Sequence, residues 1–191
     1  MQKKVLFIDR DGTLILETDD FKIEKFHKLV FYPQVFYWLG RIVRELDYEL
    51  AMVTNQDGLG TPDFPEEDFW QVQDFIVRTF EGEGIVFKNV HIDKSFPHEG
   101  LATRKPGTGM LTQYMDGSYD LKNSFVIGDR ITDVQLAKNL DCKCIWLDDG
   151  RALGATEVSN SRQELNAHIG LATRDWEKVY NYLKGLADQT A

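Results

Sequence analysis

Short apolar runs alternate along this chain with segments whose apolar residues recur at helical spacing. The apolar runs fall at residues 5–8, 49–53, 85–92, 124–127 and 143–147. Near-continuous apolar runs of this length are typical of strands that are covered on both faces. Because strands that alternate with helices form parallel sheets, the pattern predicts an α/β fold with a central parallel sheet flanked by helices.

The helical segments can be placed from the same pattern. Apolar residues repeat at i, i+3, i+4 and i+7 within residues 35–46 and 69–80. Pro65 and Pro106 stand where a first helical turn would begin, so we expect helices to start near both. The tail repeats apolar residues at helical spacing, which predicts a closing helix at about 173–188. The longest irregular stretches, which we expect to be loops, are residues 14–31, 56–64, 93–104 and 148–168.

Charge and composition exclude several kinds of partner. The 191 residues carry a formal net charge of -9, and such a chain repels the phosphate backbone of nucleic acids. The apolar run at residues 5–8 is too short for a signal segment or a membrane span, so we expect no membrane partner and a cytoplasmic location. Cys142 and Cys144 are expected to be buried, reduced thiols. The length predicts a single domain over residues 1–191.

Two carboxylates follow the first predicted strand directly. The sequence there reads Asp9-Arg10-Asp11-Gly12-Thr13, and open α/β sheets hold their ligands at the carboxyl ends of their strands. Two close acids beside an apolar wall repel each other, unless a divalent cation lies between them or one of them keeps a proton. The alternative is a solvated turn, because Asp and Gly end many strands.

Polar residues also follow three later predicted elements. Thr54 and Asn55 come at the end of the second strand, where a hydroxyl and backbone N–H groups could hold phosphate oxygens. Lys105 stands before a predicted helix, an unfavourable place for a cation unless it pairs with an anion. Asp129 ends the fourth strand and Asp133 lies in the following helical turn, and such hard oxygen ligands suit Mg²⁺.

These four motifs, in this order and spacing, resemble the haloacid dehalogenase superfamily of phosphatases over about residues 4–147. The resemblance implies a Rossmann-like three-layer fold. It further implies that Asp9 attacks phosphorus to form an aspartyl phosphate, and that Asp11 protonates the leaving oxygen and then activates water. The Mg²⁺ ligands would be Asp9, the main-chain carbonyl of Asp11, and Asp129.

The resemblance also implies a phosphate-binding set and a supporting acid. Thr54 and Lys105 match phosphate-holding positions, and Asp133 matches the second acid of the fourth motif. The complete set predicted to bind phosphate or substrate is Arg10, Thr54, Asn55, Arg104 and Lys105. Neither of the superfamily's usual insertion points has room for a large cap domain, so we expect an open site.

A narrower resemblance covers nearly the whole chain. The stretches from Phe7 to Thr13 and from Thr54 to Gly60, together with Gly128-Asp129-Arg130, are similar to the histidinol-phosphate phosphatase domain of bifunctional histidine-biosynthesis enzymes. The substrate implied is a small phosphorylated metabolite, histidinol phosphate. The dehydratase half of such enzymes is absent, so the chain is interpreted as a domain cut from, or a single-function version of, the bifunctional protein.

One departure concerns a zinc loop that such phosphatases commonly carry before the Arg-Lys-Pro motif. Residues 93–103 contain no cysteine here, and a lone His98 beside carboxylates is a poor zinc site, so no zinc is expected. The loop must then be ordered by packing or remain mobile.

Three other functions stay open. One is a phosphatase for heptose bisphosphate or another sugar phosphate, and a second is a DNA 3′-phosphatase, which the acidic charge disfavours. The third is a catalytically silent binding domain. If histidinol phosphate is the substrate, its cationic amine needs an acidic partner, and the acids after the nucleophile are candidates: Glu17, Asp19, Asp20 and Glu24.

Overall fold

In the computed structural model, which describes residues 2–151 and 153–190, the strands form a parallel sheet in the order β3-β2-β1-β4-β5-β6. The strands are β1 (Val5–Ile8), β2 (Glu49–Asn55), β3 (Phe87–Asp93), β4 (Phe125–Gly128), β5 (Lys143–Trp146) and β6 (Ile169–Ala172). The α-helices are α1 (Val35–Glu45), α2 (Glu66–Gly82), α3 (Ile131–Asn139), α4 (Arg162–Asn166) and α5 (Trp176–Thr190). Short 3₁₀ helices lie at η1 (Phe26–Lys28), η2 (Pro97–Glu99), η3 (Gly109–Tyr114) and η4 (Leu121–Asn123). The predicted α/β class is confirmed.

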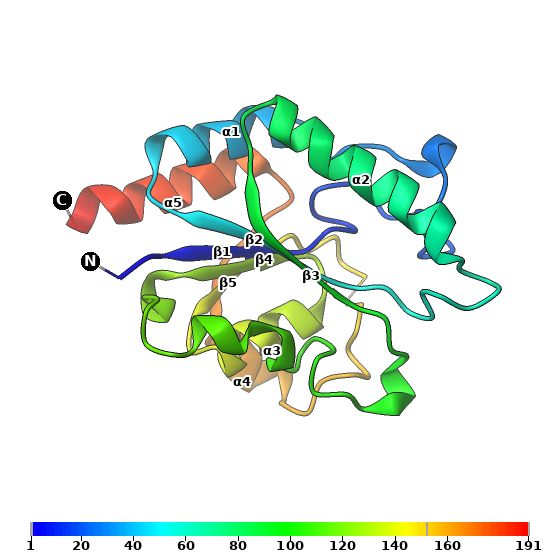
Figure 1. Ribbon diagram of the computed structural model, residues 1–191. Helices are drawn as coiled ribbons and strands as arrows, with labels where there is room; N and C mark the ends of the chain where they lie inside the picture. Colours follow the sequence, from blue (N-terminus) through cyan, green and yellow to red (C-terminus); the bar gives the residue numbers. More distant parts are fainter. Residues whose placement is uncertain (1, 152, 191) are drawn as a thin grey trace.

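Helices cover both faces of the sheet. Helices α1, α2 and α5 lie on one side, and α3 and α4 lie on the other (Figure 1). The alternation of side chains along β1 explains the two cores, because successive residues of a strand point to opposite faces. Leu6 and Ile8 belong to the core under α1, α2 and α5, whereas Val5 and Phe7 belong to the core under α3. The three-layer arrangement implied by the resemblance is therefore present.

The predicted closing helix is confirmed as α5. Its first residue, Trp176, is buried, and the indole N–H donates to the Thr13 carbonyl at 3.2 Å. This bond joins the end of the chain to the turn that follows β1. The predicted burial of Cys142 and Cys144 is also confirmed, and burial raises the pKa of the Cys142 thiol to about 12, so it stays an unreactive thiol.

Two elements lie where the sequence indicated only loop. Strand β6 and the five-residue helix α4 fall in or just after the stretch 148–168. Strand β6 is an edge strand of four residues, and none of them is buried, so it carries almost no apolar signal. Its pairing with β5, rather than its own composition, makes it a strand.

The prediction of a helix starting at Pro106 is wrong in both the type of helix and its position. The chain instead turns back on itself, and a 3₁₀ helix, η3, begins at Gly109. The Gly109 N–H donates to the Ala102 carbonyl at 2.8 Å, and a Cβ added at Gly107 would lie 2.3 Å from that carbonyl oxygen. This close approach needs glycine and prevents a helix from starting directly after Lys105.

The described residues contain no separate cap domain at either insertion point. Residues 12–34 form a loop with η1, and residues 56–65 form a turn before α2. No helix in the described ranges is long and apolar enough to cross a bilayer.

Candidate active site

The order of strands places a crevice beside β1. Strands β2 and β3 lie on one side of β1, and β4, β5 and β6 lie on the other. The strand order therefore reverses between β1 and β4, which makes this position the topological switch point of the sheet. Ligands bind outside the carboxyl ends of strands at such a switch point. Asp9 follows β1 and Asp129 follows β4 at this point.

Lys105 links two of the predicted site residues. Its Nζ lies 2.7 Å from Oδ1 of Asp9 and 2.8 Å from Oδ1 of Asp133, and all three residues are buried. The other oxygen of Asp133 accepts the Arg130 N–H at 3.0 Å, at the start of α3. Burial alone would lower the pKa of Lys105, but Asp133 and Asp9 raise it above its ordinary value, so the ammonium stays charged. Asp133 therefore holds the lysine in position beside Asp9.

Among the described residues of this cluster, Asp129 is the one whose carboxylate accepts no hydrogen bond. Both of its carboxylate oxygens are buried. Asp9, Asp129 and Asp133 each offer an oxygen within 4.8 Å of the others. A Cβ on Gly12, which has a φ of +73°, would lie 2.3 Å from the Asp129 carboxylate, so the turn after β1 must approach that oxygen closely. Buried, unpartnered hard oxygens fit a divalent cation such as Mg²⁺.

The electrostatics of Asp9 and Asp129 agree with a cation site. Burial raises the pKa of Asp9 to about 7, with Asp133 and Asp11 adding to the rise, although Lys105 opposes it. Burial, followed by the charge of Asp9, raises the pKa of Asp129 well above its ordinary value. Two such acids are costly to ionise together, and a cation between them would offset the repulsion.

Asp11 is held by neighbours on its other side. Arg10 donates to both carboxylate oxygens, at 2.9 to 3.1 Å, and the Gln56 amide donates to Oδ2 at 2.6 Å. Gln56 also donates to the Thr54 hydroxyl at 2.8 Å, which fixes the positions of both predicted site residues. The sequence indicated no role for Gln56, although it lies inside the motif from Thr54 to Gly60.

Arg10 does not lie where phosphate binding requires. Its side chain is fully buried, points toward α2, donates to Gln73 at 3.2 Å and lies 4.9 Å from the centre of the Phe69 ring. It is absent from the lining of the cavity that Asp9, Asp11 and Lys105 share. The prediction that Arg10 contacts substrate phosphate is therefore corrected: Arg10 orients Asp11.

A cavity of about 280 Å³ opens at this edge of the sheet. The predicted site residues that line it are Asp9, Asp11, Thr54, Asn55, Arg104 and Lys105. Asn55 fixes the backbone of Lys105, because its amide accepts the Lys105 N–H and donates to the Lys105 carbonyl, both at 3.0 Å. Asp129 and Asp133 do not line the cavity and belong to the buried cluster with Asp9.

Arg104 joins three segments at one wall of the cavity. Its guanidinium donates to Asp57 at 2.5 Å, to Glu157 at 2.8 Å and to the Ser95 carbonyl at 2.8 Å. Sequence analysis missed Asp57 and Glu157. Asp57 lies in the motif after β2 and could have been suspected, but Glu157 lies in a loop without any motif.

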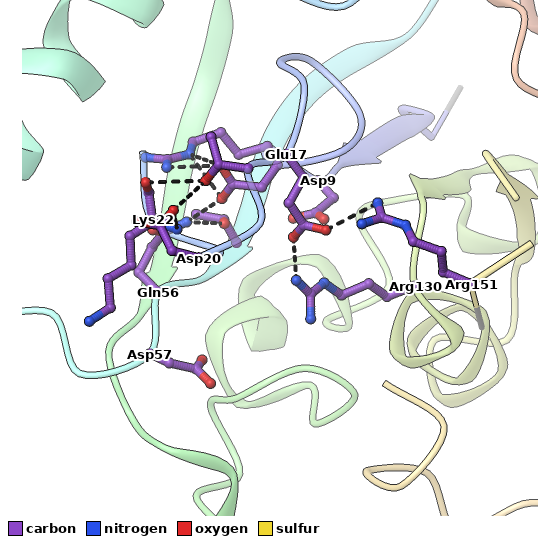
Figure 2. A network of polar contacts seen from close by, with 12 residues as sticks. Asp9, Glu17, Asp20, Lys22, Gln56, Asp57, Arg130 and Arg151 are labelled. Atoms are coloured by element: carbon purple, nitrogen blue, oxygen red, sulfur yellow. Dashed lines mark hydrogen bonds and ion pairs between the residues drawn. The ribbon is translucent and has the colours of Figure 1, made fainter. Parts of the chain in front are cut away.

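The acidic segment after β1 is already paired. Figure 2 shows Glu17 between two arginines, and it forms ion pairs with Arg130 and Arg151. Asp20 and Glu24 bind Lys28, at 2.5 and 3.0 Å. Only Glu17 and Asp20 of the four predicted acids line the cavity among the described residues, so this segment offers no unpaired carboxylate to a substrate amine. Asp19 is exposed outside the cavity lining.

Comparison with known proteins gives a family match and several relatives. The model of the family described as HAD-hydrolase-like matches residues 102–168. The histidine biosynthesis bifunctional protein HisB of Bacteroides fragilis is 50% identical over 185 residues, which is 96% of this chain and 48% of that protein. HisB of Spirosoma linguale is 49% identical over 186 residues, covering 95% of this chain and 49% of that protein. The chain thus spans about half the length of these relatives.

Solved structures share the fold. A D,D-heptose 1,7-bisphosphate phosphatase from B. bronchiseptica, complexed with magnesium and phosphate, has a TM-score of 0.74 at 22% identity, over 98% of this chain and 99% of that one. The corresponding phosphatase from Burkholderia thailandensis has a TM-score of 0.51 at 18% identity, over 96% of this chain and 99% of that one. The chain is therefore similar to HAD-hydrolase-like proteins over residues 102–168 and to one part of the HisB proteins over nearly its whole length, and it shares the fold of these solved phosphatases.

Proposed function

We propose that this chain is a Mg²⁺-dependent phosphatase that hydrolyses L-histidinol phosphate to L-histidinol and phosphate in histidine biosynthesis. The observation that carries the reaction class is the buried cluster in which Lys105 binds Asp9 while Asp129 keeps two unpartnered oxygens. The observed identity to HisB proteins supports the choice of pathway. The remainder of those longer proteins would hold the dehydratase, and a cytoplasmic location stays a prediction.

The first chemical step forms a bond between a carboxylate oxygen of Asp9 and phosphorus and breaks the bond to the substrate's alcohol oxygen. Asp11 gives its proton to that oxygen, so histidinol leaves as the neutral alcohol. Lys105 keeps its charge beside Asp9 and stabilises the negative charge on the phosphoryl oxygens. When bound, Mg²⁺ would be held by Asp9 and Asp129, with the Asp11 carbonyl as the further predicted ligand, and would neutralise phosphate charge.

The second step hydrolyses the acyl phosphate. The Asp11 carboxylate takes a proton from water, the water oxygen bonds to phosphorus, and the bond to Asp9 breaks. Inorganic phosphate is released, and both aspartates return to their starting states. Arg10 and Gln56 hold the Asp11 carboxylate in one orientation during both steps.

Asp11→Asn should separate the two steps. With an aryl phosphate, whose leaving group needs little protonation, phosphorylation of Asp9 continues, but hydrolysis slows by about 10² to 10⁴ because water lacks its base. Acid-quenched samples should therefore contain accumulated phosphoprotein, measured by intact mass. Rapid release of phosphate without accumulated phosphoprotein would contradict the role of Asp11.

The charges of the cavity favour a substrate with a cationic end. Six carboxylates and four basic side chains line it, and the basic side chains Arg104 and Arg130 already contact carboxylates. A second phosphate, as in heptose bisphosphate, would have to displace those pairs. An ammonium would not, because Asp57 and Glu157 share a single guanidinium and leave one negative charge uncompensated. This charge balance supports histidinol phosphate over the sugar bisphosphate.

Asp57 is the carboxylate we place opposite the substrate amine. It lines the cavity, and its side chain is 44% exposed, compared with 19% for Glu157. Asp57→Asn should raise KM for histidinol phosphate about 10-fold, more at low salt than at high salt, and leave KM for an aryl phosphate without an amine unaffected. Asp19→Asn, an exposed acid outside the cavity lining, is the matched control and should leave both KM values unchanged. Equal effects of Asp57→Asn on both substrates would exclude amine recognition.

The function itself is tested by release of inorganic phosphate with Mg²⁺. We expect kcat/KM to be higher for histidinol phosphate than for heptose bisphosphate, and the reverse order would favour the sugar phosphatase. No release from any phosphomonoester would favour a silent binding domain. Elemental analysis of the purified protein checks the predicted absence of zinc.

A further inference from the structure

The loop between β3 and Lys105 has almost no apolar support. Apart from Ser95, every residue from Lys94 to Thr103 is exposed, and none of them belongs to the hydrophobic core clusters of the described residues. The residues that follow, Arg104 and Lys105, are nevertheless buried in the cavity wall. Polar contacts must therefore order this loop and hold Arg104 in its position.

Asp93 supplies three of these contacts from the end of β3. It is buried, and its Oδ1 accepts both the Ser95 N–H, at 2.9 Å, and the Ser95 hydroxyl. Its Oδ2 accepts the Thr103 hydroxyl at 2.6 Å. The carboxylate thus bridges the beginning and the end of the loop, ten residues apart in sequence.

The same network reaches Arg104 by two routes. Thr103 is its covalent neighbour, and the Ser95 carbonyl accepts from its Nη1 at 2.8 Å. Asp93, Ser95, Arg104 and Thr103 therefore form a closed ring of bonds. The backbone carbonyl of Asp93 also accepts the Gln56 N–H at 2.7 Å, which fixes the ring to the segment after β2.

We propose that Asp93 is a positioning residue that acts through Arg104: its carboxylate orders residues 94–103 and aims the guanidinium of Arg104 at the cavity. Lys105 has its own support, because Asn55 binds its N–H and its carbonyl. Loss of Asp93 should therefore displace Arg104 and with it Asp57, the carboxylate placed opposite the substrate amine, and disturb substrate binding more than the chemistry at Asp9. This inference rests on the proposed phosphatase function for its kinetic readout only.

Asp93→Ala should raise KM for histidinol phosphate by about 10- to 100-fold, with a smaller change in kcat, because Arg104 is misplaced and Lys105 is not. In an Arg104→Ala background, Asp93→Ala should add no further change in KM, because the two residues act as one unit. Hydrogen exchange should speed up in residues 94–104 alone. Thr103→Val, which removes one bond of the ring, should show the same KM effect in weaker form, and provides the test if Asp93→Ala fails to fold.

Asp116 provides a matched control. It makes the same local pair of bonds, to the N–H of Ser118 at 2.9 Å and to its hydroxyl at 2.6 Å, but on an exposed turn outside the cavity lining. Asp116→Ala should leave KM and the exchange of residues 94–104 unchanged. A wild-type KM in Asp93→Ala, or an effect that adds fully to that of Arg104→Ala, would overturn the inference. If the wild-type protein does not hydrolyse histidinol phosphate, the proposed function fails, and the exchange measurement alone decides whether Asp93 orders the loop.

Discussion

Asp9→Asn should lower kcat for any phosphomonoester by about three orders of magnitude or more while the protein stays folded. An amide oxygen is a far weaker nucleophile than a carboxylate, so the covalent step is lost. The fold should persist because Lys105 keeps its ion pair with Asp133, and because removing one negative charge relieves the repulsion in the buried cluster.

Steady-state kinetics and circular dichroism check this prediction together. Asp19→Asn, which makes the same chemical change at an exposed position outside the cavity lining, should retain wild-type kcat. An Asp9→Asn protein with kcat near that of the wild type would remove Asp9 from the mechanism.

Asp129→Asn should make the metal-free protein more stable and abolish its response to Mg²⁺. Burial and the charge of Asp9 raise the pKa of Asp129, which means that the folded state pays for ionising this group. The neutral amide removes that cost. It also replaces one of the two unpartnered oxygens with an NH₂ group and leaves only a neutral amide oxygen for a cation, so activity with Mg²⁺ should fall along with metal binding.

The raised pKa of Asp9 determines how the stability of the metal-free protein changes with pH. The pKa of Asp9 is raised from 3.8 to about 7, so between these values the folded protein binds more protons than the unfolded chain. The free energy of unfolding of the metal-free protein should therefore fall as pH rises from about 4 to about 7. Saturating Mg²⁺ should reverse this loss, by about 2.7 kcal/mol when its concentration is 100 times Kd.

Thermal unfolding with and without Mg²⁺, across this pH range, measures both effects. The wild-type Tm should rise on adding Mg²⁺, whereas that of Asp129→Asn should start higher and stay constant. Asp116→Asn, an exposed acid on a turn outside the cavity lining, serves as the control and should respond to Mg²⁺ as the wild type does. If Asp129→Asn lowered the metal-free Tm, the carboxylate would have a stabilising partner that the geometry does not show.

The sequence was sufficient to place the strand ends and the residues that follow them. The apolar runs predict the buried strands, and the carboxyl ends of parallel strands meet at the same edge, so the sequence alone predicts that Asp9, Thr54 and Asp129 lie together. Lys105 lies beside Asp9 as the pattern predicted, although the helix expected after it does not form.

Side-chain direction and loop contacts could not be predicted in the same way. Arg10 lies in a bend directly after β1, where the alternation of a strand no longer indicates the direction of a side chain, and it faces Gln73 on α2 instead of the cavity. Glu157 reaches Arg104 from a loop more than fifty residues away, and such a contact leaves no periodic signal. Strand β6 is defined by its pairing with β5, which its own sequence does not encode.

The central claim, that Asp9 is the nucleophile of a Mg²⁺-dependent phosphatase, is tested most directly by acid quench during the first turnover. Wild-type protein is mixed with histidinol phosphate and Mg²⁺, quenched within milliseconds, digested, and mapped by mass spectrometry. We predict a phosphoryl group on the peptide containing Asp9, located on Asp9 itself, and its absence when Mg²⁺ is chelated. Release of a full turnover of phosphate with no phosphorylated peptide at any quench time, or a phosphoryl group on another residue, would contradict the proposed mechanism.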